Sequence, residues 1–383
     1  MIFAQLYLKL LPFFLAFGVI LHMYRIVGVF PYFVPIYYGI WQIFDIVLYL
    51  LCRPRLTKFT LLIMCLLCAS LVVGYISFPF ERHTITDFSN PLIFFLKIEV
   101  FILIFSKINF EKYAVYFSKV TIIICGICLP LVYYVISHSA FPRMSVYAPL
   151  ELAFSWCLLS GYWRLLVIVI IQIVLFGQRA MSVSLLGSYL LTLYFQKIKI
   201  KIILSIILVL VLGLTYFLVK DTIAFDRLAK TFTMNYMDLD FEQSANQASA
   251  GRLNEIVCIT NTMQWYDYLL GKGCGARYFF FTGYDTVLSW QSHFSPLSFT
   301  MKYGVFFCVL IYGFILLQIY RGIRLYKKSR SNVYACIASI ALSMFLFESM
   351  FSYLLLSSYA PLLLGYIIHI HKMHVHNEQG HEL

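Results

Sequence analysis

Long apolar stretches constrain this chain more than any other feature of its sequence. They follow one another from Gln5 to Ile370, most of them separated by short polar linkers. A helix that crosses a bilayer needs roughly 20 mainly apolar residues, because the hydrocarbon layer is about 30 Å thick. Hydrophobic residues make up 62% of the 383 positions and charged residues 12%, which is too few polar side chains to cover a water-exposed surface. The chain is therefore predicted to be an integral membrane protein.

The predicted fold class is an all-α polytopic membrane protein with about twelve transmembrane helices. One large polar segment, residues 220–295, separates helices 1–9 within residues 1–219 from helices 10–12 within residues 296–371, and residues 372–383 form a polar tail. The spans are expected at residues 5–24, 28–52, 59–78, 91–106, 115–137, 147–161, 164–177, 180–195, 202–219, 296–319, 332–348 and 354–371.

Basic residues in the linkers orient the chain. In this count of spans, four linkers rich in Lys and Arg fall on one side of the membrane, and the alternate linkers are poorer in cations. The positive-inside rule places the basic side in the cytoplasm. Both termini are then cytoplasmic, and residues 220–295 are extracytoplasmic. The net charge of +12 reflects this orientation, so no nucleic-acid partner is expected. The four linkers are residues 53–58, 107–112, 196–201 and 321–330.

The stretch SAGRLNEIV, residues 249–257, is a polar patch within this large segment. Ser249 is a suitable N-cap, and apolar residues recur after it at helical spacing. The pattern predicts a short amphipathic helix that lies on the membrane surface, although its polar face is imperfect. Arg252 lies near the N-terminus of this helix, and Glu255 lies on the same polar face one turn later.

Glycines alternate in LLGKGCGARYFF, residues 269–280, and permit a tight bend there. Arg277 follows the bend directly. His293 comes just before the next span, so its side chain is expected close to the membrane plane. Cys258 and Cys274 lie in the same segment, and the sequence leaves open whether they form a disulfide.

Several ionisable residues lie within or beside apolar spans. An arginine at mid-bilayer costs about 2.5–3.5 kcal/mol on insertion scales, so such residues generally face a cavity or a partner. Arg179 lies between two apolar segments at the expected extracytoplasmic end. A guanidinium stays charged and binds phosphate oxygens in bidentate fashion, so Arg179, Arg252 and Arg277 together predict a site for an anionic lipid headgroup. Lys97 and Glu151 either line the same cavity or pair with other polar groups.

The order and placement of four motifs resemble the O-antigen polymerase and O-antigen ligase superfamily. The likeness covers residues 177–304 in motif and the whole chain in topology. Each motif is loose, and the combination beside one large loop is more specific than any of them alone. The motifs are GQRA at residues 177–180, SAGR at 249–252, LLGKGCG at 269–275 and SHFSPLSFTMKYG at 292–304.

This resemblance implies a membrane glycosyltransferase of the GT-C type in the bacterial inner membrane. Such an enzyme takes a glycan from an undecaprenyl diphosphate carrier at the periplasmic face. Polymerases join lipid-linked repeat units and work with a separate chain-length regulator, whereas ligases transfer the glycan to the lipid A core. Position by position, the family's arginine in a span corresponds to Arg179, its loop arginine to Arg252 and its histidine before the following span to His293. Ligases commonly have His-Asn at the last site, and Phe294 in this chain favours the polymerase.

A reaction of this kind assigns roles to the candidate residues. Diphosphate is a good leaving group, so the protein must stabilise its negative charge and accept a proton from the acceptor hydroxyl. The three arginines, with Lys97 as a further candidate, would bind the diphosphate. His293 is the first candidate for the general base and Glu255 the second. No metal or other cofactor is required.

Two alternatives are considered. The ligase belongs to the same class of enzyme and separates from the polymerase by phenotype. A flippase or transporter of lipid-linked sugars belongs to a different class, and it predicts repeated halves with ionisable residues through the central spans. No convincing internal repeat is found, and the single long loop breaks any symmetry between the halves.

Overall fold

A computed structural model describes most of the chain outside the large polar segment. The described ranges are residues 2–26, 33–138, 147–176, 179–195, 252–281, 286–290, 292–350 and 355–380, with isolated positions between 202 and 213. Most of the predicted span 202–219 and the first part of the predicted loop, including Ser249, lie outside them.

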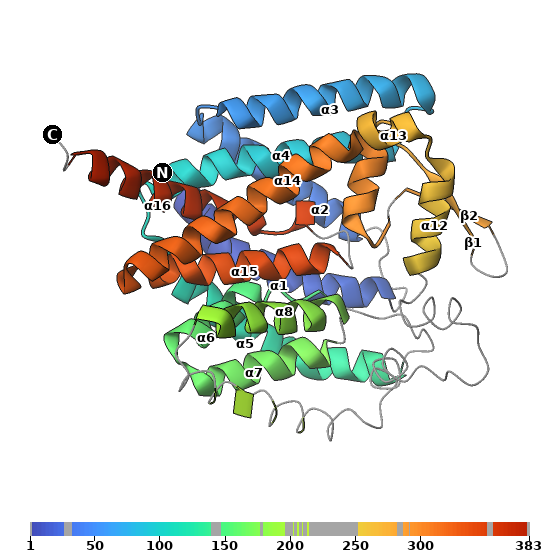
Figure 1. Cartoon of the computed structure of the whole chain (residues 1–383). Helices are drawn as coiled ribbons and strands as arrows, with labels where there is room; N and C mark the ends of the chain where they lie inside the picture. Colours follow the sequence, from blue (N-terminus) through green and yellow to red (C-terminus); the bar gives the residue numbers. More distant parts are fainter. Residues whose placement is uncertain are drawn as a thin grey trace.

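The described residues form long helices and one short β-hairpin (Figure 1). The strands β1 (Tyr278–Phe281) and β2 (Thr286–Ser289) pair antiparallel. Two 3₁₀ turns, η1 (Arg330–Asn332) and η2 (Leu355–Ser357), precede the last two helices. The helices are α1 (Ile2–Ile26), α2 (Phe33–Cys52), α3 (Lys58–Ser77), α4 (Arg82–Phe105), α5 (Phe110–His138), α6 (Glu151–Ser160), α7 (Trp163–Leu175), α8 (Arg179–Phe195), α12 (Arg252–Thr262), α13 (Trp265–Leu270), α14 (Ser295–Lys328), α15 (Val333–Ser349) and α16 (Ala360–Gly380).

Several of these helices have the length and composition of membrane spans. Among the described residues, 6 helical segments are long and apolar enough to cross a bilayer; they lie in α1, α3, α4, α5, α14 and in η1 with α15. The protein is therefore a helical polytopic membrane protein. The helices α6 and α7 have 10 and 13 residues, which at about 1.5 Å per residue is less than the thickness of the hydrocarbon layer. Gly161, with a φ of 77°, turns the chain between them.

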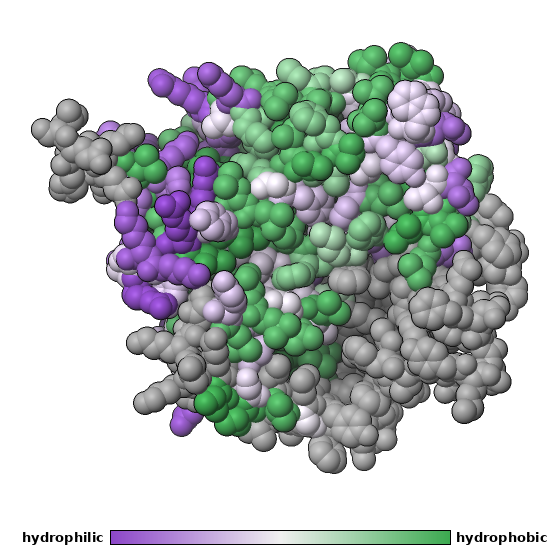
Figure 2. All heavy atoms as spheres, in the orientation of Figure 1, coloured by the Kyte–Doolittle hydropathy of each residue, from purple (hydrophilic) through white to green (hydrophobic). Residues whose placement is uncertain are grey.

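The helices run side by side in alternating directions, so each end of the bundle collects alternate linkers (Figure 1). Hydrophilic side chains gather at the end that carries both termini (Figure 2). The helices α12 and α13 and the hairpin cap the opposite end. This separation agrees with the predicted one-sided distribution of cations. The exposed basic residues at the first end include Arg53, Arg55, Lys58, Lys107, Lys112, Arg324, Lys327, Lys328 and Arg330.

The glycine-rich bend, residues 271–275, is seated in the bundle. Its three glycines have φ values of 76°, 94° and 86°, in the left-handed region that favours glycine. A Cβ at Gly273 would lie 2.2 Å from the backbone nitrogen of Gly74 in α3, so the two backbones touch. The predicted tight bend is confirmed, and it packs against a membrane span.

The glycine-rich bend packs against a kink in α14. Gly304 has a non-helical φ of 84° inside α14, which interrupts the helical hydrogen bonds of the preceding turn. The N–H groups of Lys272 and Gly273 donate to the carbonyls of Met301 and Lys302, at 2.7 and 3.0 Å. Backbone groups freed by the kink are thereby satisfied, as buried polar groups must be.

Candidate active site

His293 and Glu255 form a hydrogen-bonded pair at the capped end of the bundle. The His293 Nδ1 atom lies 2.7 Å from Oε1 of Glu255. The second carboxylate oxygen, Oε2, accepts from the backbone N–H of His293 at 2.9 Å and from the hydroxyl of Ser292 at 3.2 Å. The His293 side chain is 62% exposed, whereas that of Glu255 is 9% exposed. A buried carboxylate thus holds an imidazole whose remaining ring edge faces outward.

The charge state of Glu255 follows from these contacts. Burial alone would raise the pKa of its carboxyl, but the hydrogen bonds and charge of His293, together with the Ser292 hydroxyl, outweigh burial and lower the pKa. Glu255 is therefore ionised at neutral pH and accepts a hydrogen bond from the Nδ1–H group of His293. In the neutral imidazole this leaves Nε2 as the free acceptor. The pair has the arrangement of a general base with its orienting carboxylate.

Two helix starts position the pair. The Ser292 hydroxyl accepts from the N–H of Phe294 at 3.1 Å, so the chain turns into α14 immediately after His293. The helix α12 presents Glu255 from the other side and packs its apolar face against β1 and α14. The small core that fixes this packing consists of Ile259, Met263, Ala276, Tyr278 and Met301.

Arg277 joins the hairpin to the start of α4. Its Nη2 atom lies 3.1 Å from Oε1 of Glu81, which is the N-cap residue of α4. The Arg277 side chain is 17% exposed and that of Glu81 is 41% exposed, so this ion pair lies at the edge of the cap. The pKa of Tyr278, the next residue, is raised to about 12 by burial and by the charge of Glu255. The cap therefore brings the Arg277 segment within electrostatic reach of Glu255.

The two other predicted arginines begin helices, and their side chains lie outside the described residues. Arg179 is the first residue of α8, and Arg252 is the first residue of α12. Arg252 thus stands three positions before Glu255 on one helix, which is the spacing of neighbours on a helix face. Convergence of the three guanidinium groups stays a prediction.

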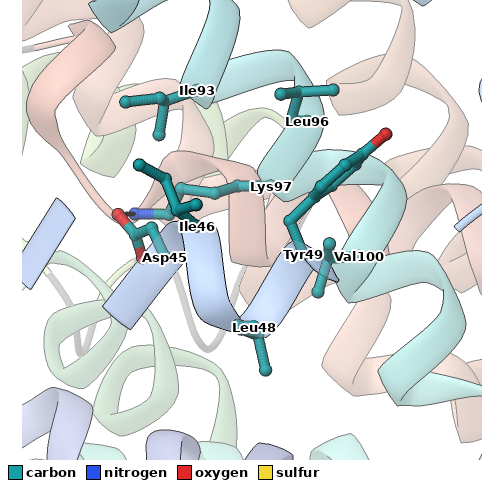
Figure 3. A pocket seen from close by; sticks show the side chains of 8 residues that line it. All are labelled: Asp45, Ile46, Leu48, Tyr49, Ile93, Leu96, Lys97 and Val100. Carbon is teal, nitrogen blue, oxygen red and sulfur yellow. Dashed lines mark hydrogen bonds and ion pairs between the residues drawn. The ribbon is translucent and has the colours of Figure 1, made fainter. Parts of the chain in front are cut away.

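Lys97 lies deeper in the bundle, away from the Arg277–Glu81 pair. It belongs to α4, 15 residues after Arg82, and the helical rise makes that separation roughly 22 Å. Its Nζ donates to Oδ2 of Asp45 at 3.0 Å, and the hydroxyl of Tyr7 donates to Oδ1 of the same carboxylate at 2.6 Å. Figure 3 shows this ion pair at the wall of an otherwise apolar pocket of about 110 Å³ between α2 and α4. Lys97 is thus placed with Asp45.

Two other acidic residues of the spans also have partners. Glu99 accepts from the backbone and hydroxyl of Thr57 and from the hydroxyl of Thr60, so it holds the N-terminus of α3. Glu151 accepts from the hydroxyl of Tyr359 at 2.8 Å, deep among α6, α15 and α16. Tyr359 satisfies Oε2 of Glu151, whereas Oε1 of the same carboxylate is buried without a hydrogen-bond partner among the described residues.

Sequence reasoning missed the most deeply buried ion pair among the described residues, which joins α4 and α14 at the capped end of the bundle. Nζ of Lys302 lies 2.6 Å from Oδ1 of Asp87, and the two side chains are 0% and 3% exposed. The signal was available, because Lys302 stands in the apolar run SFTMKYGVFF and such a lysine needs an anionic partner. Identifying Asp87 as that partner requires the fold, since 215 positions separate the two residues.

The described residues contain no cluster of potential metal ligands and no disulfide. None of their His, Cys, Asp and Glu side chains gather in groups of three or more that could hold a metal ion. Cys258 and Cys274, whose pairing the sequence left open, are both free thiols. Burial raises the pKa of Cys274 to about 11, so its thiol is protonated at neutral pH.

The sequence matches no known family model and no curated protein. The class of protein is therefore defined from its fold and candidate site. The chain is a polytopic helical membrane protein whose cap carries a histidine–glutamate pair beside arginine-bearing segments.

Proposed function

We propose that this protein is a membrane glycosyltransferase of the O-antigen polymerase type. It joins oligosaccharide repeat units carried on undecaprenyl diphosphate, at the periplasmic face of a bacterial inner membrane. The proposal includes the twelve-span topology and the extracytoplasmic placement of residues 220–295. Its substrates are two lipid-linked glycans, one donor and one acceptor, and a separate chain-length regulator is an expected partner.

The observation that carries the proposal is the hydrogen bond between His293 and Glu255. An exposed imidazole oriented through Nδ1 by an ionised carboxylate is suited to remove a proton from a hydroxyl at Nε2. The acceptor in polysaccharide polymerisation is a sugar hydroxyl. Glu255 then acts as a positioning residue, and it stabilises the imidazolium that forms when His293 takes the proton.

In the proposed reaction, one bond forms for each bond that breaks, and no cofactor is needed. The acceptor oxygen forms a bond to the anomeric carbon of the donor glycan, and the bond from that carbon to the diphosphate oxygen breaks. His293 takes the hydroxyl proton, and undecaprenyl diphosphate leaves with the bonding electrons. Cationic side chains at the capped end of the bundle stabilise the negative charge of the departing diphosphate, and such stabilisation is often the largest catalytic contribution. Arg277, Arg252 and Arg179 fill this role in the proposal.

Location supports the assignment of Arg277 and leaves Lys97 with a different role. Arg277 lies at the edge of the cap on the side of Glu81, where a headgroup enters from the outer leaflet. Lys97 is engaged with Asp45 about two-thirds of the way along α4. The proposal therefore keeps Arg277 among the diphosphate-binding residues and assigns Lys97 to the apolar pocket between α2 and α4.

Deletion of the gene tests the class of function in the host. Loss of a polymerase leaves single repeat units on the lipid A core, whereas loss of a ligase leaves the core bare. Loss of a flippase leaves no repeat units on the core and holds them in the cytoplasmic leaflet. Electrophoresis of the surface glycan, with leaflet-specific labelling of the lipid-linked intermediate, separates the three results.

Reconstitution tests the chemistry. The lipid-linked repeat unit that accumulates in the deletion strain is extracted and added to the purified protein in liposomes. A polymerase converts it to longer lipid-linked chains and releases undecaprenyl diphosphate. The proposal fails if chains of more than one repeat never form with wild-type protein.

One observation favours the flippase as the second candidate. Ionisable residues are distributed through the spans, including the Lys97–Asp45 pair and Glu151. Transporters use such residues to bind coupling ions near the middle of the bilayer. Translocation of a fluorescent lipid-linked sugar across liposomes, without any growth in glycan length, would select this alternative.

A further inference from the structure

The carboxylate of Asp87 connects three segments of the capped end. Its Oδ1 accepts from Nζ of Lys302 in α14 at 2.6 Å, and its Oδ2 accepts from the backbone N–H of Gly275 in the bend at 3.0 Å. Asp87 itself lies in α4. The Asp87 side chain therefore links α4 to the glycine-rich bend and to the N-terminal part of α14.

The backbone of Asp87 strengthens the same junction. Its carbonyl would normally accept from the N–H four residues later in α4, but that residue is Pro91, which has no N–H. The hydroxyl of Tyr303 donates to this carbonyl at 2.6 Å instead. The contact between α4 and α14 is thus specified at two adjacent points by Lys302 and Tyr303.

The bend is locked from its other side by α3. The hydroxyl of Ser70 donates to the carbonyl of Lys302 at 2.9 Å, and the carbonyl of Ser70 accepts from the N–H of Cys274 at 3.0 Å. Cys274 is fully buried against Gly74. Release of the bend would therefore expose the Cys274 thiol.

Each connected segment also carries a residue of the proposed site or the ion-pair partner of one. Gly275 lies two residues before Arg277, and Asp87 lies six residues after Glu81, the partner of Arg277. Lys302 lies nine residues after His293, in the part of α14 that precedes the kink at Gly304. The geometry of the Asp87 junction therefore sets the distance between the Arg277 segment and the His293–Glu255 pair.

We propose that Asp87 and Lys302 are the positioning residues of this site: their buried ion pair fixes the Arg277 segment relative to the His293–Glu255 pair. This inference rests on the proposed function. Both side chains are buried, so they act through the segments they hold. A buried ion pair is fragile to the loss of one partner, because the remaining charge is left without compensation, whereas removal of both charges together is tolerated. The test therefore compares a variant that loses one charge with a variant that loses both.

The experiment measures the exposure of Cys274 and catalysis in the same proteins. Full-length protein with Cys258→Ser is reconstituted in liposomes, and a membrane-impermeant maleimide is added outside; Cys274→Ser in this background gives the remaining label. Lys302→Met is expected to raise the labelling rate of Cys274 at least tenfold. It should lower kcat for chain growth at least tenfold and change KM less than threefold, because neither residue contacts substrate. The double variant Asp87→Asn/Lys302→Met keeps an acceptor for Gly275 and should restore both values to within about threefold.

Lys97→Met is the matched control, since it also removes a lysine paired to a buried aspartate, and it should leave Cys274 protected. Where Lys302→Met gives no folded protein, Asp87→Asn alone is compared with the double variant. Unchanged Cys274 labelling and unchanged kcat per folded molecule in Lys302→Met would overturn the inference, as would a double variant that folds without recovering kcat. Rescued Cys274 protection in a protein whose wild type builds no chains would support the junction and reject the proposed function.

Discussion

The imidazole of His293 lies 2.7 Å from the carboxylate of Glu255, which stands 38 positions earlier in the chain. The sequence identified both residues, as competing candidates for one role. Their contact gives them complementary roles instead: the buried, ionised Glu255 orients the ring, and the exposed His293 is the group that can meet a substrate. In the proposed reaction, Nε2 of His293 accepts the proton of the acceptor hydroxyl.

His293→Ala is expected to lower the rate of chain growth by about 10²–10⁴-fold, the usual contribution of a general base. The side chain is mostly exposed, so the protein should fold and insert normally. His376→Ala, an exposed histidine at the opposite end of the bundle, is the matched control and should keep the wild-type rate. Glycan chains that lengthen at the wild-type rate in His293→Ala liposomes would remove His293 from the mechanism.

Glu255→Gln should lower the rate less than His293→Ala, because the amide oxygen can still accept from Nδ1. Without the carboxylate, the imidazolium that forms during the reaction loses its stabilising charge, so kcat should fall while KM changes little. An unchanged kcat per folded molecule would mean that Glu255 acts only on the fold.

Glu255 also predicts the pH dependence of stability. Its pKa is lowered from the ordinary value of 4.5, so its stabilising contribution is complete above about pH 4.5 and is lost as the pH falls through the lower folded-state pKa. Thermal unfolding in detergent between pH 7 and pH 3 should show a steeper loss for wild type than for Glu255→Gln. Parallel curves for the two proteins would contradict this assignment.

Arg277 and Glu81 should respond differently to substitution. If Arg277 binds diphosphate, Glu81 competes with the substrate for the guanidinium. Arg277→Ala should then weaken binding of the lipid-linked donor at least tenfold, whereas Glu81→Gln should retain or improve it. An ion pair with only a structural role would make both variants lose stability to a similar extent and leave KM unchanged. Kinetics with the extracted lipid-linked repeat unit, together with thermal unfolding, separates the two cases.

Local patterns in the sequence predicted the elements better than their contacts. Each predicted span outside residues 202–219 overlaps a described helix, because hydrophobic length is a strong constraint in a bilayer. The ends were less well predicted: α14 continues to Lys328, and α16 runs from Ala360 to Gly380, through most of the predicted polar tail. The predicted span 91–106 was too short at its start: α4 begins at Arg82, where Glu81 and Thr84 form a capping box. Polar residues such as Asp87 in that first part are buried against α14 and the bend, which composition cannot indicate.

The contacts of the charged residues required the fold. Lys97 was correctly flagged as an ionisable residue in an apolar span, but its pairing with Asp45 depends on how α2 and α4 cross. The glycines at 271–275 predicted a bend, and its insertion against Gly74 depends on the kink at Gly304, which is 29 or more residues later. Ion pairs and backbone contacts between distant segments have no local sequence signature.

The seating of the bend predicts a large effect for one small substitution. In Gly273→Ala, the added Cβ would meet the backbone of Gly74 at 2.2 Å, at a φ of 94° that alanine rarely adopts. The bend should leave the bundle, and the thermal midpoint should fall by several degrees. Gly39→Ala is the control, because nothing lies within 4 Å of its Cβ and alanine favours a helix. Equal thermal midpoints in the two variants would show that the bend does not contact α3.

The orientation of the bundle underlies all assignments to the cap. Exposed Asn261 at the end of α12 and exposed Lys107 between α4 and α5 lie at opposite ends. In a Cys258→Ser background in intact cells, an impermeant maleimide should label Asn261→Cys, and it should label Lys107→Cys only after the membrane is permeabilised. The positive-inside rule requires this result, because Lys107 belongs to the basic end. The reverse pattern would place the His293–Glu255 pair in the cytoplasm, where polymerisation of exported repeat units cannot occur, and the proposed function would have to be abandoned.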